Sequence, residues 1–272
     1  MKTILWGLLC ALSARSVAQI IRPSALQPMH AVAYNQQFAD IFSCKINPAA
    51  LGTLRHFQAG AYVEKKYLLQ GLRQYSIIAA APTAAGGWSF SMDYSGLASY
   101  RQWESSLAWG RKLGKLSIGA QVDHAVQHAG SYGNKSWFSA GLSSIWQLSP
   151  VLSAGWQLFR LTGRLLSGTE GERPAYGYSA GLGLQIAPGL LLETRLIKNE
   201  GQASSVLAGI HYKADERLVT SCLLDLTDTR PSMRVKWLSG NFQLGVTGSY
   251  HPLLGFSPGV LLIVPGVKKG GL

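Results

Sequence analysis

Fourteen short segments of alternating polarity dominate the chain from about residue 55 to residue 265. Side chains alternate between the two faces of a β-strand, so this period of two predicts strands with one apolar face. Most segments are close to the ~9–11 residues that a tilted strand needs to cross a bilayer. We expect strands at residues 55–65, 73–82, 87–96, 100–110, 114–127, 136–148, 151–160, 175–187, 189–198, 203–213, 216–227, 231–239, 241–250 and 257–265.

The connections between these segments differ in length. Every second connection is tight and rich in turn-forming residues, as at Ser149-Pro150 and Ala187-Pro188-Gly189. The others are longer or more irregular, and the longest runs from Leu161 to Pro174. Bacterial outer-membrane barrels have short periplasmic turns and longer external loops. The pattern therefore predicts an all-β, closed antiparallel transmembrane barrel of about 14 strands, or 12 if the first and last segments stay outside it.

The two faces of the segments differ in chemistry. One face collects aromatic and aliphatic residues such as Trp88, Phe90, Trp146 and Leu182, and the other collects Ser, Gly and Gln. Only 14% of the residues are charged, against roughly 25% in an average soluble domain. A soluble β-sandwich also alternates, but 8 Trp and 11 Tyr would overfill its core. We therefore expect the aromatic face to contact lipid and the small polar face to line the lumen.

The N-terminal region lacks this alternation. Residues 1–18 resemble a secretory signal peptide with a basic start, an apolar run and a small-x-small cleavage site before Gln19. We expect residues 19–54 to form a plug inside the barrel of residues 55–272, because a lumen of 14 strands is too wide for wall side chains to fill. Within the plug we expect a short helix from Ala31 to Phe42 and a turn at Asn47-Pro48.

The charge indicates which partners the chain can bind, and the positions of the cysteines indicate whether they form a disulfide. The net charge of +12 is dispersed along an exported chain, which favours lipid head groups or an acidic partner and argues against nucleic acid. Cys222 falls on the expected lipid face while Cys44 lies in the expected plug, so we expect both thiols to be free.

Asn47-Pro48-Ala49 lies just before the first expected strand. There the chain resembles the outer-membrane family of the long-chain fatty-acid transporter FadL, and especially its Bacteroidota branch around the PorV and PorQ proteins of type IX secretion. The hairpin from Trp109 to Gly119 is also similar to theirs. This resemblance implies a 14-strand barrel in the outer membrane. It does not by itself decide function, because the family includes both transporters and secretion components.

No catalytic, cofactor-binding or metal site is expected. His124 lies in phase with the lipid face, whereas Asp123 points to the other side, so no Ser–His–acid arrangement forms. The strand positions expected to face inward include charged residues. They predict either a polar conduit or, as we favour, salt bridges between these residues that fill the lumen. The residues of this candidate lumenal network are Glu64, Asp93, Glu104, Asp123, Glu193, Arg195, His211, Asp225, Arg234 and Lys236.

Two functions follow as hypotheses. The first is a non-enzymatic component of a protein secretion or surface-assembly system, with lipid and other secretion proteins as partners. The alternative is a FadL-like transporter of small hydrophobic compounds. A transporter needs an apolar pocket bounded by the plug or the wall, whereas a scaffold needs only a blocked lumen and an exposed partner surface.

Overall fold

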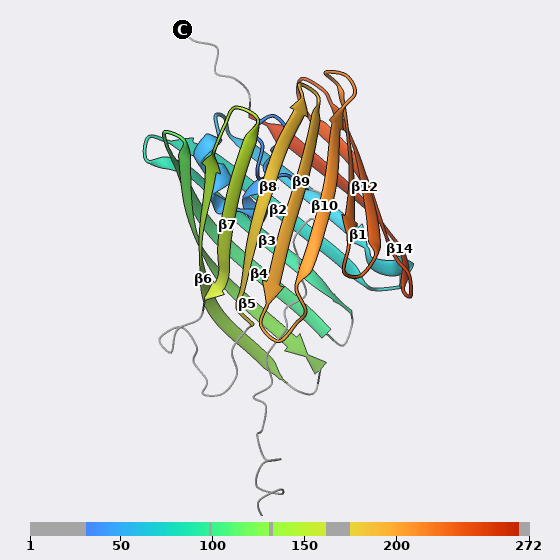
Figure 1. Ribbon diagram of the computed structural model, residues 1–272. Coiled ribbons are helices and arrows are strands. Elements are labelled where there is room, and N and C mark those ends of the chain that lie inside the picture. The colour runs from blue at the N-terminus through green and yellow to red at the C-terminus, as the bar shows by residue number, and fades with distance from the viewer. Residues whose placement is uncertain (1–30, 98–99, 131–132, 162–174, 267–272) are drawn as a thin grey trace, which may run out of the picture.

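The computed structural model describes residues 31–97, 100–130, 133–161 and 175–266. They form a closed antiparallel barrel in which each strand pairs with its neighbours in sequence and β1 pairs with β14 (Figure 1). The strands are β1 Gln58–Lys65, β2 Arg73–Thr83, β3 Gly86–Leu97, β4 Tyr100–Leu113, β5 Leu116–Ala129, β6 Asn134–Gln147, β7 Leu152–Leu161, β8 Gly177–Ala187, β9 Leu190–Asn199, β10 Ser205–Lys213, β11 Leu218–Asp225, β12 Arg230–Leu238, β13 Gln243–His251 and β14 Gly255–Pro265.

All fourteen expected strands are present, and the first and last close the barrel, so the count of 12 is excluded. The expected contrast in connection length is weaker than the sequence suggested. Only residues 98–99 separate β3 from β4, and residues 226–229 separate β11 from β12. The longest predicted connection, after Leu161, lies outside the described residues.

The predicted assignment of faces is confirmed. Trp88, Phe90, Trp146 and Leu182 point outward with 42–51% of their surface exposed, and Ser89 and Ser91 point inward and are buried. Cys222 is exposed on the outer face and Cys44 is buried, and both are free thiols. The wall is thus apolar outside and polar inside, as in a barrel whose outer surface faces lipid.

One strand departs from simple alternation. The pairing of β6 with β7 shifts between Ala140 and Leu142, which places an extra residue in β7. Arg160 adopts a positive φ of 58° at this bulge. A bulge re-aims side chains locally, and here Phe159 and Arg160 both line the same interior cavity. Alternation alone could not reveal this extra inward residue.

Residues 31–54 lie inside one end of the barrel, drawn in blue at the top of Figure 1. We call residues 31–54 the plug. It contains the helix α2 Ser43–Ile46 and the 3-10 helix η1 Pro48–Thr53, while η2 Lys66–Leu68 follows β1. None of the helices in the described residues is long and apolar enough to cross a membrane.

The expected helix from Ala31 to Phe42 is wrong. The Asn35 side chain accepts hydrogen bonds from the backbone N–H groups of Gln37 and Phe38, and Asp40 accepts one from the N–H of Phe42. Such local side-chain bonds compete with helix formation and favour turns. The segment therefore winds through the lumen as consecutive turns.

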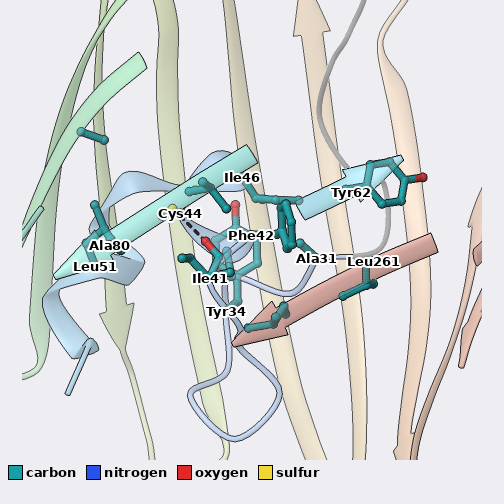
Figure 2. Close-up of a cluster of buried hydrophobic side chains, with 14 residues drawn as sticks. Ala31, Tyr34, Ile41, Phe42, Cys44, Ile46, Leu51, Tyr62, Ala80 and Leu261 are labelled. Atoms are coloured by element: carbon teal, nitrogen blue, oxygen red, sulfur yellow. Dashed lines mark hydrogen bonds between the residues drawn. The ribbon is translucent and has the colours of Figure 1, made fainter. Parts of the chain in front are cut away.

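The apolar core lies between the plug and the wall. Figure 2 shows Tyr34, Ile41, Phe42 and Cys44 of the plug gathered between inward side chains such as Tyr62 and Leu261. The Phe42 and Tyr62 rings meet edge to face with centroids 6.4 Å apart. The plug thus supplies the hydrophobic interior that an empty barrel would lack.

Candidate functional site

A row of glycines lets the plug backbone approach the wall. Gly87, Gly110 and Gly119 are register partners on β3, β4 and β5, and all three face inward. A Cβ atom at these positions would lie 2.5 Å or less from the plug backbone at Leu51, Pro48 and Ala49 respectively. Because no side chain fits in that space, the row forms the seat of η1.

The Asn47-Pro48-Ala49 motif fixes the start of η1. Asn47 is fully buried, and its side-chain amide donates to the backbone carbonyls of Ser144 and Trp156, each at 3.2 Å. Its amide oxygen accepts from the N–H of Ala49 at 3.0 Å and caps the helix. Pro48 at the first helical turn needs no donor partner there. In this chain the motif fastens the plug to β6 and β7.

A second glycine cradle holds Tyr34. Gly155 on β7 and Gly181 and Gly183 on β8 face the plug, and a Cβ at Gly181 would lie 2.1 Å from the Tyr34 ring. Nearby, the Asn35 amide donates to Gln185, and Gln37 donates to the carbonyl of Pro188. The plug therefore reaches the β8–β9 connection and closes that end of the barrel.

Two ionic contacts hold the plug from other sides. The Asp40 carboxylate lies 3.1 Å from Arg234 and 3.0 Å from Lys236 on β12, and all three side chains are buried. Burial pushes the pKa of Asp40 upward, but the attraction of Lys236 and Arg234 prevails and lowers it. At β2 and β3, Lys45 pairs with Asp93 and donates to Ser76 at 3.2 Å.

The predicted lumenal charges lie inside the barrel, but in separate groups. Glu64 pairs with Lys66 at 2.8 Å, and Asp225 pairs with Arg230 at 2.9 Å. Glu193 lies 3.3 Å from Arg195 and 3.0 Å from His211. Asp93, Arg234 and Lys236 bind the plug as described above. Glu104 and Asp123 share a cavity with Asp93.

Sequence reasoning missed the plug's own contact residues. Asp40, Lys45 and Tyr34 lie in a segment without periodicity, so no phase could assign them an inward partner. One feature of the sequence could have indicated them. Charged residues in a segment that lies inside a barrel need buried partners of opposite charge.

The cavities differ between lumen and wall. A polar groove of about 210 Å³ separates the plug from β5–β8 at the closed end, and a polar cavity of about 50 Å³ lies beside Lys45. A much larger recess of about 1000 Å³ lies on the outer wall from β8 to β14. Its outward lining is apolar and includes Leu182, Ile210, Leu224, Met233 and Phe256.

Comparisons with known proteins agree with this architecture. No family model matches the sequence, and no curated protein matches it. Among solved structures, the Ralstonia pickettii toluene transporter TbuX is similar with a TM-score of 0.60 at 11% identity, covering 87% of this chain and 94% of that chain. The CymD monoaromatic hydrocarbon channel has a TM-score of 0.58 at 10% identity, covering 89% and 95%.

The Pseudomonas putida toluene transporter TodX is also similar, with a TM-score of 0.54 at 11% identity over 82% of this chain and 92% of that chain. At such identities the likeness concerns the fold alone. The fold is a closed β-barrel similar to those of these toluene transporters and this hydrocarbon channel.

Proposed function

We propose that this chain is a non-enzymatic outer-membrane transporter that passes small hydrophobic compounds by way of its plugged barrel and apolar outer wall. The observation that carries the proposal is the recess of about 1000 Å³ in the wall from β8 to β14. Ligand pockets typically measure about 300–1,000 Å³ and are lined mainly by apolar side chains. The similarity of the fold to toluene and monoaromatic hydrocarbon channels supports the same function.

Toluene uptake tests the proposal directly. The assay needs vesicles with lipopolysaccharide in the outer leaflet, because plain phospholipid bilayers already admit small hydrocarbons. Vesicles containing the barrel should take up toluene faster than protein-free vesicles. Ile210→Trp should slow uptake by filling the recess, whereas Phe138→Trp, outward on the β6 wall, should not. Equal uptake with and without protein, or no effect of Ile210→Trp, would reject the proposal.

A secretion or surface-assembly component of the PorV/PorQ type is the second candidate. It is favoured by the plug, which buried ion pairs hold to β3 and β12, and by the small polar cavities beside it. A scaffold of this kind needs protein partners. Affinity purification from native membranes should recover secretion proteins in stoichiometric amounts if this candidate is right, and only lipid if the transporter proposal is right.

The location is part of the proposal. We infer export by the signal peptide of residues 1–18, which lie outside the described residues, followed by insertion into the outer membrane. N-terminal sequencing of the membrane-extracted protein should begin at Gln19. Recovery as a soluble periplasmic protein would contradict the assignment.

A further inference from the structure

Three carboxylates lie on adjacent strands of the inner wall beside the plug. Asp93 on β3 is the direct register partner of Glu104 on β4, and Asp123 follows on β5 opposite Ser106. Directly opposed residues have Cβ atoms about 4.5–5.5 Å apart, and like charges in that position repel. The wall therefore concentrates negative charge on adjacent strands, and something must offset it.

The available cations do not balance this charge. Lys45 is already paired with Asp93. Arg160 acts on Glu104 and Asp123 at longer range, and its guanidinium lies 5.7 Å from the centre of the Phe159 ring. Within the described residues, neither Glu104 nor Asp123 has a cation within ion-pair distance. Three carboxylates against two cations leave one negative charge in a buried place, which is costly unless it is neutralised.

A cavity of about 50 Å³ lies among these groups. Its lining includes Asp93, whose Oδ1 is buried without a hydrogen-bond partner, and Gln157, whose Oε1 is also buried without one. Both side chains are at most 3% exposed. Both orphaned atoms accept hydrogen bonds. Although Lys45, Arg160 and Gln121 also line the cavity, these two acceptor atoms remain without a donor.

The contacts of Lys45 show that the inner wall here binds an ammonium group. Its ammonium group binds one carboxylate, Asp93, and one serine hydroxyl, Ser76. We propose that the adjacent cavity binds a second, free ammonium group, either ammonium itself or the head of a small primary amine. Glu104 and Asp123 would supply its counter-charge, and the orphaned oxygens of Asp93 and Gln157 would accept its N–H bonds.

Size and geometry restrict the ligand. One water-sized group needs roughly 10–15 Å³ by the same measure of volume, so the cavity admits only about three to five non-hydrogen atoms. No cluster of three or more His, Cys, Asp or Glu in the described residues is arranged to hold a metal ion. A small alkylammonium therefore fits better than a divalent metal. The site is distinct from the outer-wall recess and does not depend on hydrocarbon transport.

The probe is ethylammonium chloride, compared with tetramethylammonium chloride at the same concentration. Both ions carry one positive charge, but only ethylammonium has N–H donors. The full chain, folded in lipid vesicles, is equilibrated with each salt at pH 8, and its thermal unfolding midpoint is measured. A ligand that binds only the folded state stabilises it in a concentration-dependent way. Ethylammonium should raise the midpoint and tetramethylammonium should not.

Matched variants locate the site. Glu104→Gln keeps the side-chain shape and should weaken ethylammonium binding about tenfold or more, because a charge-assisted hydrogen bond is lost. Glu64→Gln, an inward carboxylate already paired with Lys66, should leave binding unchanged. If Glu104→Gln fails to fold, Asp123→Asn serves instead. Equal responses to the two salts, or unchanged binding in the folded Glu104→Gln variant, would overturn the proposal and assign the excess charge to a proton.

Discussion

The two faces of β8 show how differently one strand is constrained on its two sides. Leu182 and Leu184 point outward and are 46% and 42% exposed. Gly181 and Gly183 alternate with them and point inward, where the plug leaves no room for a Cβ. On the outer face the only requirement is an apolar side chain, because lipid accepts any of them. On the inner face the size and charge of each side chain are restricted, because the plug must pack against it.

Among changes to the inner face, removal of the Asp40 charge should lower the free energy of unfolding the most. Asp40→Asn leaves Arg234 and Lys236 buried together without their counter-ion. Losing one partner of a buried ion pair typically costs about 3–5 kcal/mol. The free energy of unfolding in vesicles should fall accordingly. Asp228→Asn removes a half-exposed partner of Arg230 and should cost about 0–1 kcal/mol. If the two losses are equal, the plug is not anchored at β12.

A charge on the outer face should have the next largest effect. Arg at the bilayer midplane of a barrel costs about 2–4 kcal/mol, falling to about 0–1 near the rim. Leu182→Arg should therefore lower stability in lipid more than Leu113→Arg, which lies at the end of β4. The measurement is denaturant unfolding of both variants in vesicles. If Leu182→Arg is the milder change, the outer face of β8 does not contact the membrane interior.

A single methyl group tests the fit of the inner face. Gly181→Ala would place a Cβ 2.1 Å from the Tyr34 ring, and such overpacking typically costs about 1–3 kcal/mol. Gly240→Ala meets nothing within 4 Å and serves as control. Adding Tyr34→Ala should make Gly181→Ala nearly neutral, since the double variant removes the clash. Strictly additive effects would show that Tyr34 does not occupy the cradle.

The smallest effect should appear on acidification. The pKa of Asp40 is lowered in the folded state from about 3.9 in the unfolded chain. Its contribution to stability is therefore complete above about pH 4 and is lost as the pH falls through the lower folded value. Unfolding midpoints measured between pH 7 and pH 3 should fall more steeply for the wild type than for Asp40→Asn. Parallel curves would mean that Asp40 titrates normally.

Much of the wall could be predicted because one face meets lipid along every strand. That requirement imposes a period of two, which located the strands and oriented Leu182, Ser89 and Cys222 correctly. The same phase could not reveal the bulge at Arg160, because only Leu161 follows it in β7 and too little strand remains to show the shifted alternation. It also could not distinguish Glu64, which pairs with Lys66 of η2, from Glu104, which lies opposite Asp93 of β3.

The conformation and contacts of residues 31–54 were not predicted from the sequence. Their backbone is stabilised by the side chains of Asn35, Asp40 and Asn47 rather than by a regular helix. Those residues suit both caps and turns, so the sequence alone leaves the choice open. Glycine was expected on the lumenal face in general, but the role of Gly87, Gly110 and Gly119 as a seat became evident only with η1 against them.

The central claim, that residues 31–54 close the barrel from within, is tested most directly by locking the plug to β3. The Cys44 sulfur lies 3.8 Å from the Ser89 hydroxyl, so Ser89→Cys in a Cys222→Ser background should allow a disulfide. Joining two thiols requires an added oxidant, and the reaction is slow because burial raises the pKa of Cys44 to about 11 and keeps its thiolate scarce. The account predicts loss of both thiols only in the folded barrel. Two free thiols that react with a water-soluble maleimide in the folded protein would contradict it.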